Sequence, residues 1–143
     1  MDRGQADATA AGQWLAGQGV VPDHALVSAA TRAMETWTGL ASGAGWDTEP
    51  SVDEGFYAAG PDTALDLLRG TPADARVLVV VGHNPTIAHL AQLLDDGDGD
   101  PEASKEMASG FPTSAVAVFE YDGAWADLEL TSARLVAFHV GRG

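Results

Sequence analysis

The sequence predicts a three-layer α/β/α sandwich in which helices cover both faces of a mixed, mostly parallel sheet. Continuous apolar runs at 24–28 and 76–81 are typical of strands that are covered on both faces. Each run leads into a helical pattern, and a hairpin pattern follows towards residue 143. Alternating strands and helices that end in an antiparallel pair predict this fold class. The length of 143 residues fits one domain spanning 1–143.

Hydrophobic periodicity and breaker residues place the individual elements along the chain. Helices are expected at 4–18, 30–42, 61–69 and about 84–94, and strands at 24–28, 76–81, 113–121, 125–130 and 134–140. Residues 46–52 form an irregular or strand-like segment, and the acidic, glycine-rich run 95–101 predicts a solvated loop. The pair Asp122-Gly123 is typical of a tight hairpin turn. We therefore expect the last part of the chain to be rich in β-structure.

The charge balance restricts the ligands that this chain can bind. Seven Lys and Arg residues face 21 Asp and Glu residues, which gives a net charge of −14. So few basic residues cannot build a broad cationic face for nucleic acid, and anionic membranes are disfavoured for the same reason. A small anionic ligand is still compatible with the sequence, because a pocket needs only two or three focused donors.

The cysteine and histidine content argues against redox and metal chemistry. The sequence has no cysteine, which excludes disulfides, thiolate catalysis and sulfur-bound zinc. Its four histidines, His24, His83, His89 and His139, are too scattered for an obvious metal site, so we expect no cofactor. No apolar run approaches the ~18 residues of a membrane helix, and no secretory signal is visible. We expect a cytoplasmic location.

The junction after the run 76–81 is the strongest candidate for chemistry. There the strand leads into Gly82, His83, Asn84 and Pro85. Asn84 is the expected helix cap, and Pro85 suits the first helical position. His83 is thus expected at the carboxyl end of a parallel strand beside a helix N-terminus, where open α/β sheets bind ligands and anions. The alternative is that His83 only bridges a strand-to-helix loop.

A second junction has the same form. Ser28 ends the run 24–28 as the expected cap of the next helix, and Arg32 falls in the first turn. The helix dipole disfavours an arginine there, and an anion bound beside it would remove that penalty. The alternative is a surface arginine paired with Glu35 or another acid.

Two motifs at these junctions and three further segments follow one family pattern. Ser28, Arg32, Ala33 and Thr36 form a Ser-x-x-x-Arg-Ala-x-x-Thr motif, and Gly82 to Pro85 form Gly-His-Asn-Pro. The supporting segments are Asp2-Arg3-Gly4-Gln5, Asp53-Glu54-Gly55-Phe56-Tyr57 and Phe111-Pro112-Thr113-Ser114-Ala115. The chain resembles the histidine phosphatase superfamily, and most closely its SixA-type phosphohistidine phosphatases, over essentially all 143 residues.

The resemblance implies a phosphoglycerate mutase-like fold and a site without a metal. It assigns Arg32 and His83 to phosphate binding and to stabilisation of transition-state charge, and Ser28 and Asn84 are further candidate substrate-binding residues. Glu54 is a candidate acid, although a structural or solvent-facing role is favoured for it, and His89 is expected to pack. The implied substrate is a phosphohistidine in a protein partner, or a small phosphomonoester.

The sequence departs from the family at the attacking group. The family's nucleophile is the histidine of an Arg-His-Gly or Arg-His-Ala motif at the end of its first strand, and no Arg-His pair occurs here. We expect that strand inside the sheet, flanked by 24–28 and 76–81. Without it, these two strands either pair directly or another segment fills the place. A truncated phosphatase is the favoured explanation, and the alternative is an inactive module that binds phosphate or a protein partner.

Overall fold

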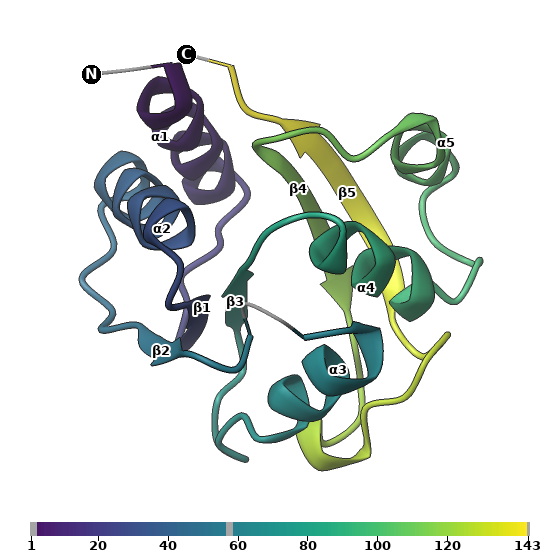
Figure 1. Cartoon of the computed structure of the whole chain (residues 1–143). Helices are drawn as coiled ribbons and strands as arrows, with labels where there is room; N and C mark the ends of the chain where they lie inside the picture. The colour runs from purple at the N-terminus through teal and green to yellow at the C-terminus, as the bar shows by residue number, and fades with distance from the viewer. Residues whose placement is uncertain (1–2, 57–58, 143) are drawn as a thin grey trace.

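The computed structural model describes residues 3–56 and 59–142, in which helices and strands alternate (Figure 1). The elements are α1 (Arg3–Gly17), β1 (His24–Ser28), α2 (Thr31–Ala44), β2 (Ser51–Asp53), α3 (Pro61–Arg69), β3 (Leu78–Val81), α4 (Thr86–Leu94), α5 (Pro101–Ser109), β4 (Ala115–Glu120), the 3-10 helix η1 (Trp125–Asp127) and β5 (Arg134–Val140).

Two apolar cores lie on opposite faces of the strands and define three layers. One core joins α1 and α2 to the strands and includes Val27 and Trp37. The other joins α3 and α4 to the strands and includes Leu26 and Leu65. Because Leu26 and Val27 are consecutive on β1, their side chains point to opposite faces, and β1 is covered on both sides. The predicted α/β/α sandwich is confirmed.

The strands form one parallel group and one antiparallel pair. β2, β1 and β3 are hydrogen-bonded in that order, and all pairings are parallel. β4 and β5 form an antiparallel pair with an irregularity after Val118. This agrees with the mixed, mostly parallel arrangement that the sequence predicts.

The two groups occupy one layer that is interrupted between β3 and β4. No strand pairing joins them within residues 3–56 and 59–142. Even so, Val79 of β3 packs against the same core as Val116 of β4. On the other face, Val80 of β3 packs against the same core as Phe119 of β4. Sharing both cores places the groups side by side, with β4 and β5 next to β3 in Figure 1.

Of the two outcomes expected around the missing strand, direct pairing is the one observed. β1 and β3 pair with each other, with Ala25 opposite Val79 and Val27 opposite Val81, so no place for a strand remains between 24–28 and 76–81. Direct pairing satisfies the N–H and C=O groups on the facing edges of both strands, which would be costly to bury unpaired. The interruption of the sheet lies instead on the other side of β3.

The start of β3 differs from the predicted boundary for a local reason. The amides of Arg76 and Val77 donate to one carboxylate oxygen of Asp23, at 2.8 and 2.9 Å. They therefore leave the strand ladder, and β3 begins at Leu78 rather than at residue 76. These two hydrogen bonds, with that from Arg76 the larger cause, hold the pKa of Asp23 below its usual value.

Residues 125–130 do not form the predicted strand. Residues 125–127 form η1, and the segment 121–133 is a long connection between β4 and β5, so Asp122-Gly123 is not a two-residue hairpin turn. Inside this connection the indole of Trp125 donates to the carbonyl of Ala75 at 2.7 Å, and Leu128 is buried. These contacts with the α3 side outweigh the local preference for a strand.

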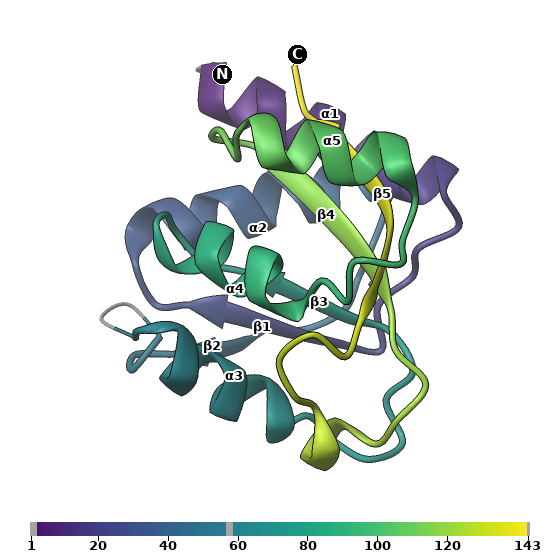
Figure 2. The same ribbon diagram turned by 90° about the vertical axis from the view of Figure 1, so that its right-hand side faces the viewer.

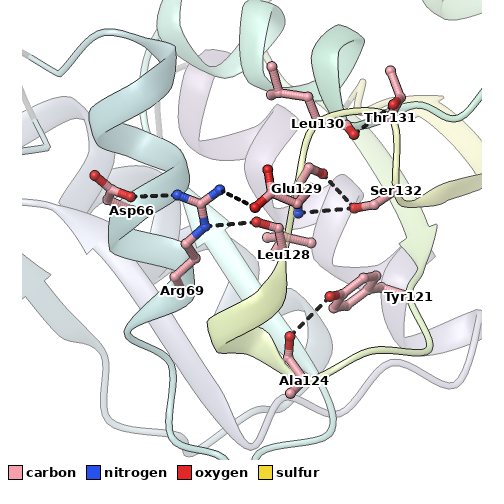
Figure 3. A network of polar contacts seen from close by, with 9 residues as sticks. All are labelled: Asp66, Arg69, Tyr121, Ala124, Leu128, Glu129, Leu130, Thr131 and Ser132. Carbon is pink, nitrogen blue, oxygen red and sulfur yellow. Dashed lines mark hydrogen bonds and ion pairs between the residues drawn. The ribbon is translucent and has the colours of Figure 1, made fainter.

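Arg69 at the end of α3 fixes the same connection (Figure 3). Its guanidinium donates to the carbonyl of Leu128 at 2.7 Å and forms ion pairs with Asp66 at 2.7 Å and Glu129 at 3.2 Å. The phenol of Tyr121 donates to the carbonyl of Ala124 at 3.0 Å within the connection. Arg69 is thus a structural residue.

Periodicity does not predict α5, because only Ala103 and Met107 of this helix are buried. The usable signal is Asp100 followed by Pro101. The Asp100 carboxylate accepts from the Ala103 amide at 2.9 Å, and Pro101 occupies the first turn.

Close packing of α1 on α2 depends on a glycine in each helix. A Cβ atom built on Gly12 would overlap the backbone carbonyl of Leu40, and one on Gly43 would overlap the carbonyl of Thr9. We expect Gly12→Ala to destabilise the fold by about 3 kcal/mol in chemical denaturation, since the helices must separate. Gly17→Ala in the same helix is the matched control, because nothing lies within 4 Å of its Cβ. An equal effect of both substitutions would contradict this packing argument.

Candidate functional site

The two predicted junctions lie on neighbouring strands at one edge of the sheet. Val27 of β1 is opposite Val81 of β3 in a parallel pairing, so both strands end at the same edge. α2 and α4 then begin at this edge, and Figure 2 shows the first turns of α1, α2 and α4 on the same side of the strands. Helix N-termini present free amides and a positive dipole end, which favour an anion here.

Arg32 is the second residue of α2, and its side chain is exposed at this edge. Its backbone carbonyl accepts from the Thr36 hydroxyl at 2.9 Å. The alternative pairing with Glu35 is not formed, and no ion pair to Arg32 exists within the described residues. The guanidinium is therefore available to an incoming anion.

Ser28 does not cap α2 as predicted. The cap position is Ala30, and Ser28 is the fully buried last residue of β1. Its hydroxyl oxygen accepts from the amide of Ala30 at 3.3 Å, which shapes the turn leading to Arg32. A buried hydroxyl has no surface for a ligand, so Ser28 acts on the site by positioning α2.

His83 follows β3 directly and is half-buried. Its carbonyl accepts from the Ile87 amide at 3.1 Å, which fixes the turn into α4. A Cβ on Gly82 would lie 2.8 Å from Ile87 Cγ1 and 2.9 Å from Phe56 Cε1, so glycine allows close packing just before His83. The contact with Phe56 also brings the segment after β2 next to the His83 turn.

Asn84 lies one residue before the cap position of α4, so the predicted cap assignment is wrong. The helix begins at Thr86, with Pro85 at the cap position rather than inside the first turn. The Asn84 side-chain oxygen still accepts from the Ala88 amide at 3.2 Å, and its NH₂ donates to the Phe111 carbonyl at 2.9 Å. With both ends of the amide engaged, Asn84 ties the His83 turn to the loop before β4.

Glu54 is exposed in the turn that follows β2, at the same edge of the sheet. Beside it, the Asp53 carboxylate accepts from the amide of Phe56 at 3.0 Å, and Phe56 is fully buried. The solvent-facing position agrees with the role favoured for Glu54. Tyr57 and Asp2 of the supporting motifs lie outside the described residues.

Arg142 is a basic residue that sequence analysis does not single out, and the structure places it against the loop before β4 and against α1. Arg142 follows β5, and its guanidinium donates to the carbonyls of Gly141 at 2.7 Å and Thr113 at 3.4 Å. It also lies 3.9 Å from the carboxylate of Asp7 on α1. No motif surrounds Arg142 in the sequence, so only the fold reveals these contacts.

The other histidines differ in setting, since His89 is exposed rather than packed and His139 stacks on Trp14.

The described residues contain neither a metal-binding cluster nor a membrane-spanning helix. No three His, Asp or Glu side chains within 3–56 and 59–142 converge as a metal-binding group. In the same part of the chain, no helix combines the length and apolar character needed to cross a membrane.

Comparison with known proteins identifies the family. No family model matches the chain. Uncharacterised proteins of Mycobacterium leprae and Mycobacterium tuberculosis are 36% and 37% identical over 98% of the chain, which covers 84% and 87% of them. A solved structure from Nakamurella multipartitia, described as a phosphohistidine phosphatase SixA, has a TM-score of 0.79 and 33% identity, over 94% of this chain and 79% of that one.

The chain therefore belongs to the histidine phosphatase superfamily, among relatives of the SixA type. Two more distant SixA structures support the fold. One, from Agrobacterium tumefaciens, has a TM-score of 0.75 at 24% identity. The other, a protein histidine phosphatase SixA complexed with tungstate, has a TM-score of 0.71 at 20% identity. They cover 94% and 93% of this chain, and 78% of each solved chain is matched.

Proposed function

We propose that this protein is a SixA-type phosphohistidine phosphatase that acts in the cytoplasm on a phosphohistidine of a protein partner or on a small phosphomonoester. The observation that carries the proposal is the pair of junctions on adjacent parallel strands, with Arg32 at the start of α2 and His83 before α4. Arginine and histidine supply the positive charge that phosphoryl transfer requires, without a metal.

Each residue has a defined task in this proposal. Arg32 binds the equatorial phosphoryl oxygens, and His83 stabilises their charge as the phosphoryl group moves. Asn84 holds the His83 turn against Phe111, and Ser28 shapes the turn before Arg32. Glu54 stands at the same edge as a candidate proton donor to the leaving group.

In this proposal the attacking histidine is supplied from outside residues 1–143, which contain no Arg-His pair. A nitrogen of its imidazole forms a bond to phosphorus while the P–N bond of the substrate phosphohistidine breaks, and the departing imidazole takes a proton. Water then attacks the phosphorylated enzyme, which releases phosphate and the free histidine. The coding sequence ahead of Met1 tests this source. An in-frame apolar strand ending in Arg-His-Gly or Arg-His-Ala supports the phosphatase, and an immediate stop codon favours the inactive module.

Binding of a tetrahedral oxyanion tests the site independently of the missing nucleophile. We expect tungstate or phosphate to shift the NMR signals of Arg32, His83 and the first turns of α2 and α4. Arg32→Ala should weaken binding about ten- to hundredfold, because a charged hydrogen-bond donor is lost. Arg76→Ala is the matched control, since this exposed arginine precedes β3 at the opposite edge of the sheet. Equal losses in both variants would show only a general charge effect and would refute the site.

A second candidate function is an inactive module that binds phosphate or a protein partner. The absence of any Arg-His pair from the 143 residues favours it. A module that binds phosphate also predicts oxyanion binding at Arg32, whereas a module that binds only a protein partner does not. Only the phosphatase predicts turnover once the attacking histidine is supplied.

A further inference from the structure

A second place for a ligand, the β2–α3 hollow, lies between the strands β1 and β2 and the end of α3, with a volume of about 240 Å³. Neither Arg32 nor His83 lines it. Its far end is at His24, which begins β1 and lies about 13 Å along that strand from Ser28 at the carboxyl edge. Its polar lining comes from His24, Ser51, Asp53, Asp66 and Thr71.

The fold directs the polar side chains of β2 into this hollow. Ser51 pairs with Leu26 of β1 in the parallel ladder, and Leu26 packs in the core that contains α3 and α4. Because side chains alternate along a strand, those of Ser51 and Asp53 point to this same face of the sheet. α3 ends at Arg69, and Gly70 then lines the hollow without a side chain that could fill it.

Thr71 carries the strongest sign that the hollow binds a ligand. It is only 7% exposed, and its hydroxyl has no hydrogen-bond partner within residues 3–56 and 59–142. Its amide donates to the Leu68 carbonyl at 3.1 Å, which fixes the residue at the end of α3. A buried hydroxyl without a partner costs free energy, and native structures normally provide one. A ligand in the hollow would provide that partner.

Other polar groups of the hollow also keep acceptor atoms for a ligand. Asp53 Oδ1 accepts from the Phe56 amide at 3.0 Å, and Asp66 Oδ1 is paired with Arg69 at 2.7 Å. In the described part of the chain, the second oxygen of each carboxylate and the imidazole of His24 have no partner. The side chain of Asp66 is 71% exposed, so the hollow is open to solvent on that side.

The charge of the lining excludes an anion and favours an organic cation. Two carboxylates face the hollow, and the guanidinium of Arg69 is already shared by Asp66 and Glu129. A metal ion does not fit, since no three His, Asp or Glu side chains converge among the described residues. A primary ammonium group offers three N–H donors to carboxylate and hydroxyl oxygens. Leu26 and Leu67 line the hollow as well and can cover a methylene stem.

We propose that the β2–α3 hollow binds a primary alkylammonium group, either of a free diamine or of a lysine side chain of another protein. Asp53 and Thr71 accept its hydrogen bonds, and Leu26 and Leu67 hold its stem. This inference is independent of the proposed phosphatase activity, because the hollow takes a cation and the edge at Arg32 takes an anion.

An NMR titration of residues 1–143 with n-butylammonium tests this inference, because that cation has the structure of a lysine side chain. We expect saturable shifts of the amide signals of Ser51, Gly70 and Thr71, with a dissociation constant of about 1 mM for so small a ligand. n-Butyltrimethylammonium carries the same charge without N–H donors, and it should bind at least about tenfold more weakly. Shifts spread over the whole acidic surface, or equal for the two cations, would refute the proposal.

Filling the hollow should abolish most of this binding. Gly70 has a φ of −79°, which other residues adopt, and a Cβ there would meet the Leu67 carbonyl at 3.4 Å, an ordinary contact. Gly70→Leu should therefore fold and weaken n-butylammonium binding at least about tenfold, because its side chain takes up the space of the stem. Gly17→Leu is the matched control, since nothing lies within 4 Å of a Cβ at Gly17. An equal loss in both variants would contradict the proposal.

Thr71→Val separates a ligand-binding role of Thr71 from a structural one. Because the hydroxyl has no partner among the described residues, its removal should leave the midpoint of chemical denaturation unchanged or raise it. Binding of n-butylammonium should weaken about three- to tenfold, the usual effect of one lost hydrogen bond. Lower stability with unchanged binding would overturn the proposal. If Gly70→Leu does not fold, this variant still decides the result.

Two larger ligands identify the source of the ammonium group. 1,4-Diaminobutane represents a free diamine, and Nα-acetyl-lysine methylamide represents a lysine within a protein. Both should displace n-butylammonium from the hollow, and the one that binds more tightly identifies the source. Failure of both ligands to displace it would overturn the proposal.

Discussion

Residues 1–143 alone should give no turnover of a phosphohistidine peptide or of p-nitrophenyl phosphate. Joining an apolar strand that ends in Arg-His-Gly ahead of α1 should raise the rate about 10⁴-fold or more, because loss of a nucleophile removes most of the rate enhancement in enzymes of covalent mechanism. The measurement is the initial rate of phosphate release, with a single-turnover test for a phosphorylated protein intermediate.

The matched control is the same extension with asparagine in place of its histidine. It provides the same strand and therefore the same fold. Because it lacks the attacking imidazole, it should remain inactive. Turnover by residues 1–143 that disappears in His83→Ala would contradict the account, since it would mean that another residue of this chain attacks phosphorus.

The second large effect concerns His83 in the extended protein. His83→Ala should lower kcat about 10²–10³-fold, the usual cost of removing one group that stabilises developing charge. KM should change less than kcat, because that interaction strengthens as the transition state forms. The assay is steady-state kinetics with a phosphohistidine peptide.

His89→Ala is the control for this substitution. His89 lies on α4, six residues after His83, and its side chain is exposed. It should leave kcat unchanged. Equal losses of kcat in both variants, or an effect of His83→Ala on KM alone, would show that His83 does not stabilise the transition state.

Much of the fold could be predicted from sequence because its core strands and helices carry strong local signals. The apolar run at His24–Ser28 and the Pro61 start of α3 give the observed bounds of β1 and α3. The helix α5 was not predicted, because its two buried residues form too short a hydrophobic pattern. The strand predicted at 125–130 is wrong because contacts distant in sequence hold this segment: the Trp125 indole donates to the Ala75 carbonyl, and Leu128 is buried with its carbonyl bound by Arg69 of α3.

The sequence predicts which strand-to-helix junctions form the candidate site. It does not predict the hydrogen bonds within them. The spacing of Arg32 and His83 after apolar runs placed both at one edge. Spacing does not reveal that Ser28 is buried or that Asn84 bonds to Phe111, because both depend on the packing of neighbouring segments. The order of strands in the sheet is likewise a tertiary property, so the interruption appeared beside β3 rather than between β1 and β3.

The central claim is that Arg32 and His83 share one phosphoryl group at the carboxyl edge of β1 and β3. A crystal structure of the protein with bound tungstate tests it most directly, since tungsten is located by its anomalous signal. The account predicts one tungstate with the Arg32 guanidinium and the His83 imidazole each within about 3 Å of its oxygens. Tungstate bound elsewhere, or Arg32 and His83 turned to opposite sides of the edge with no shared ion, would contradict it.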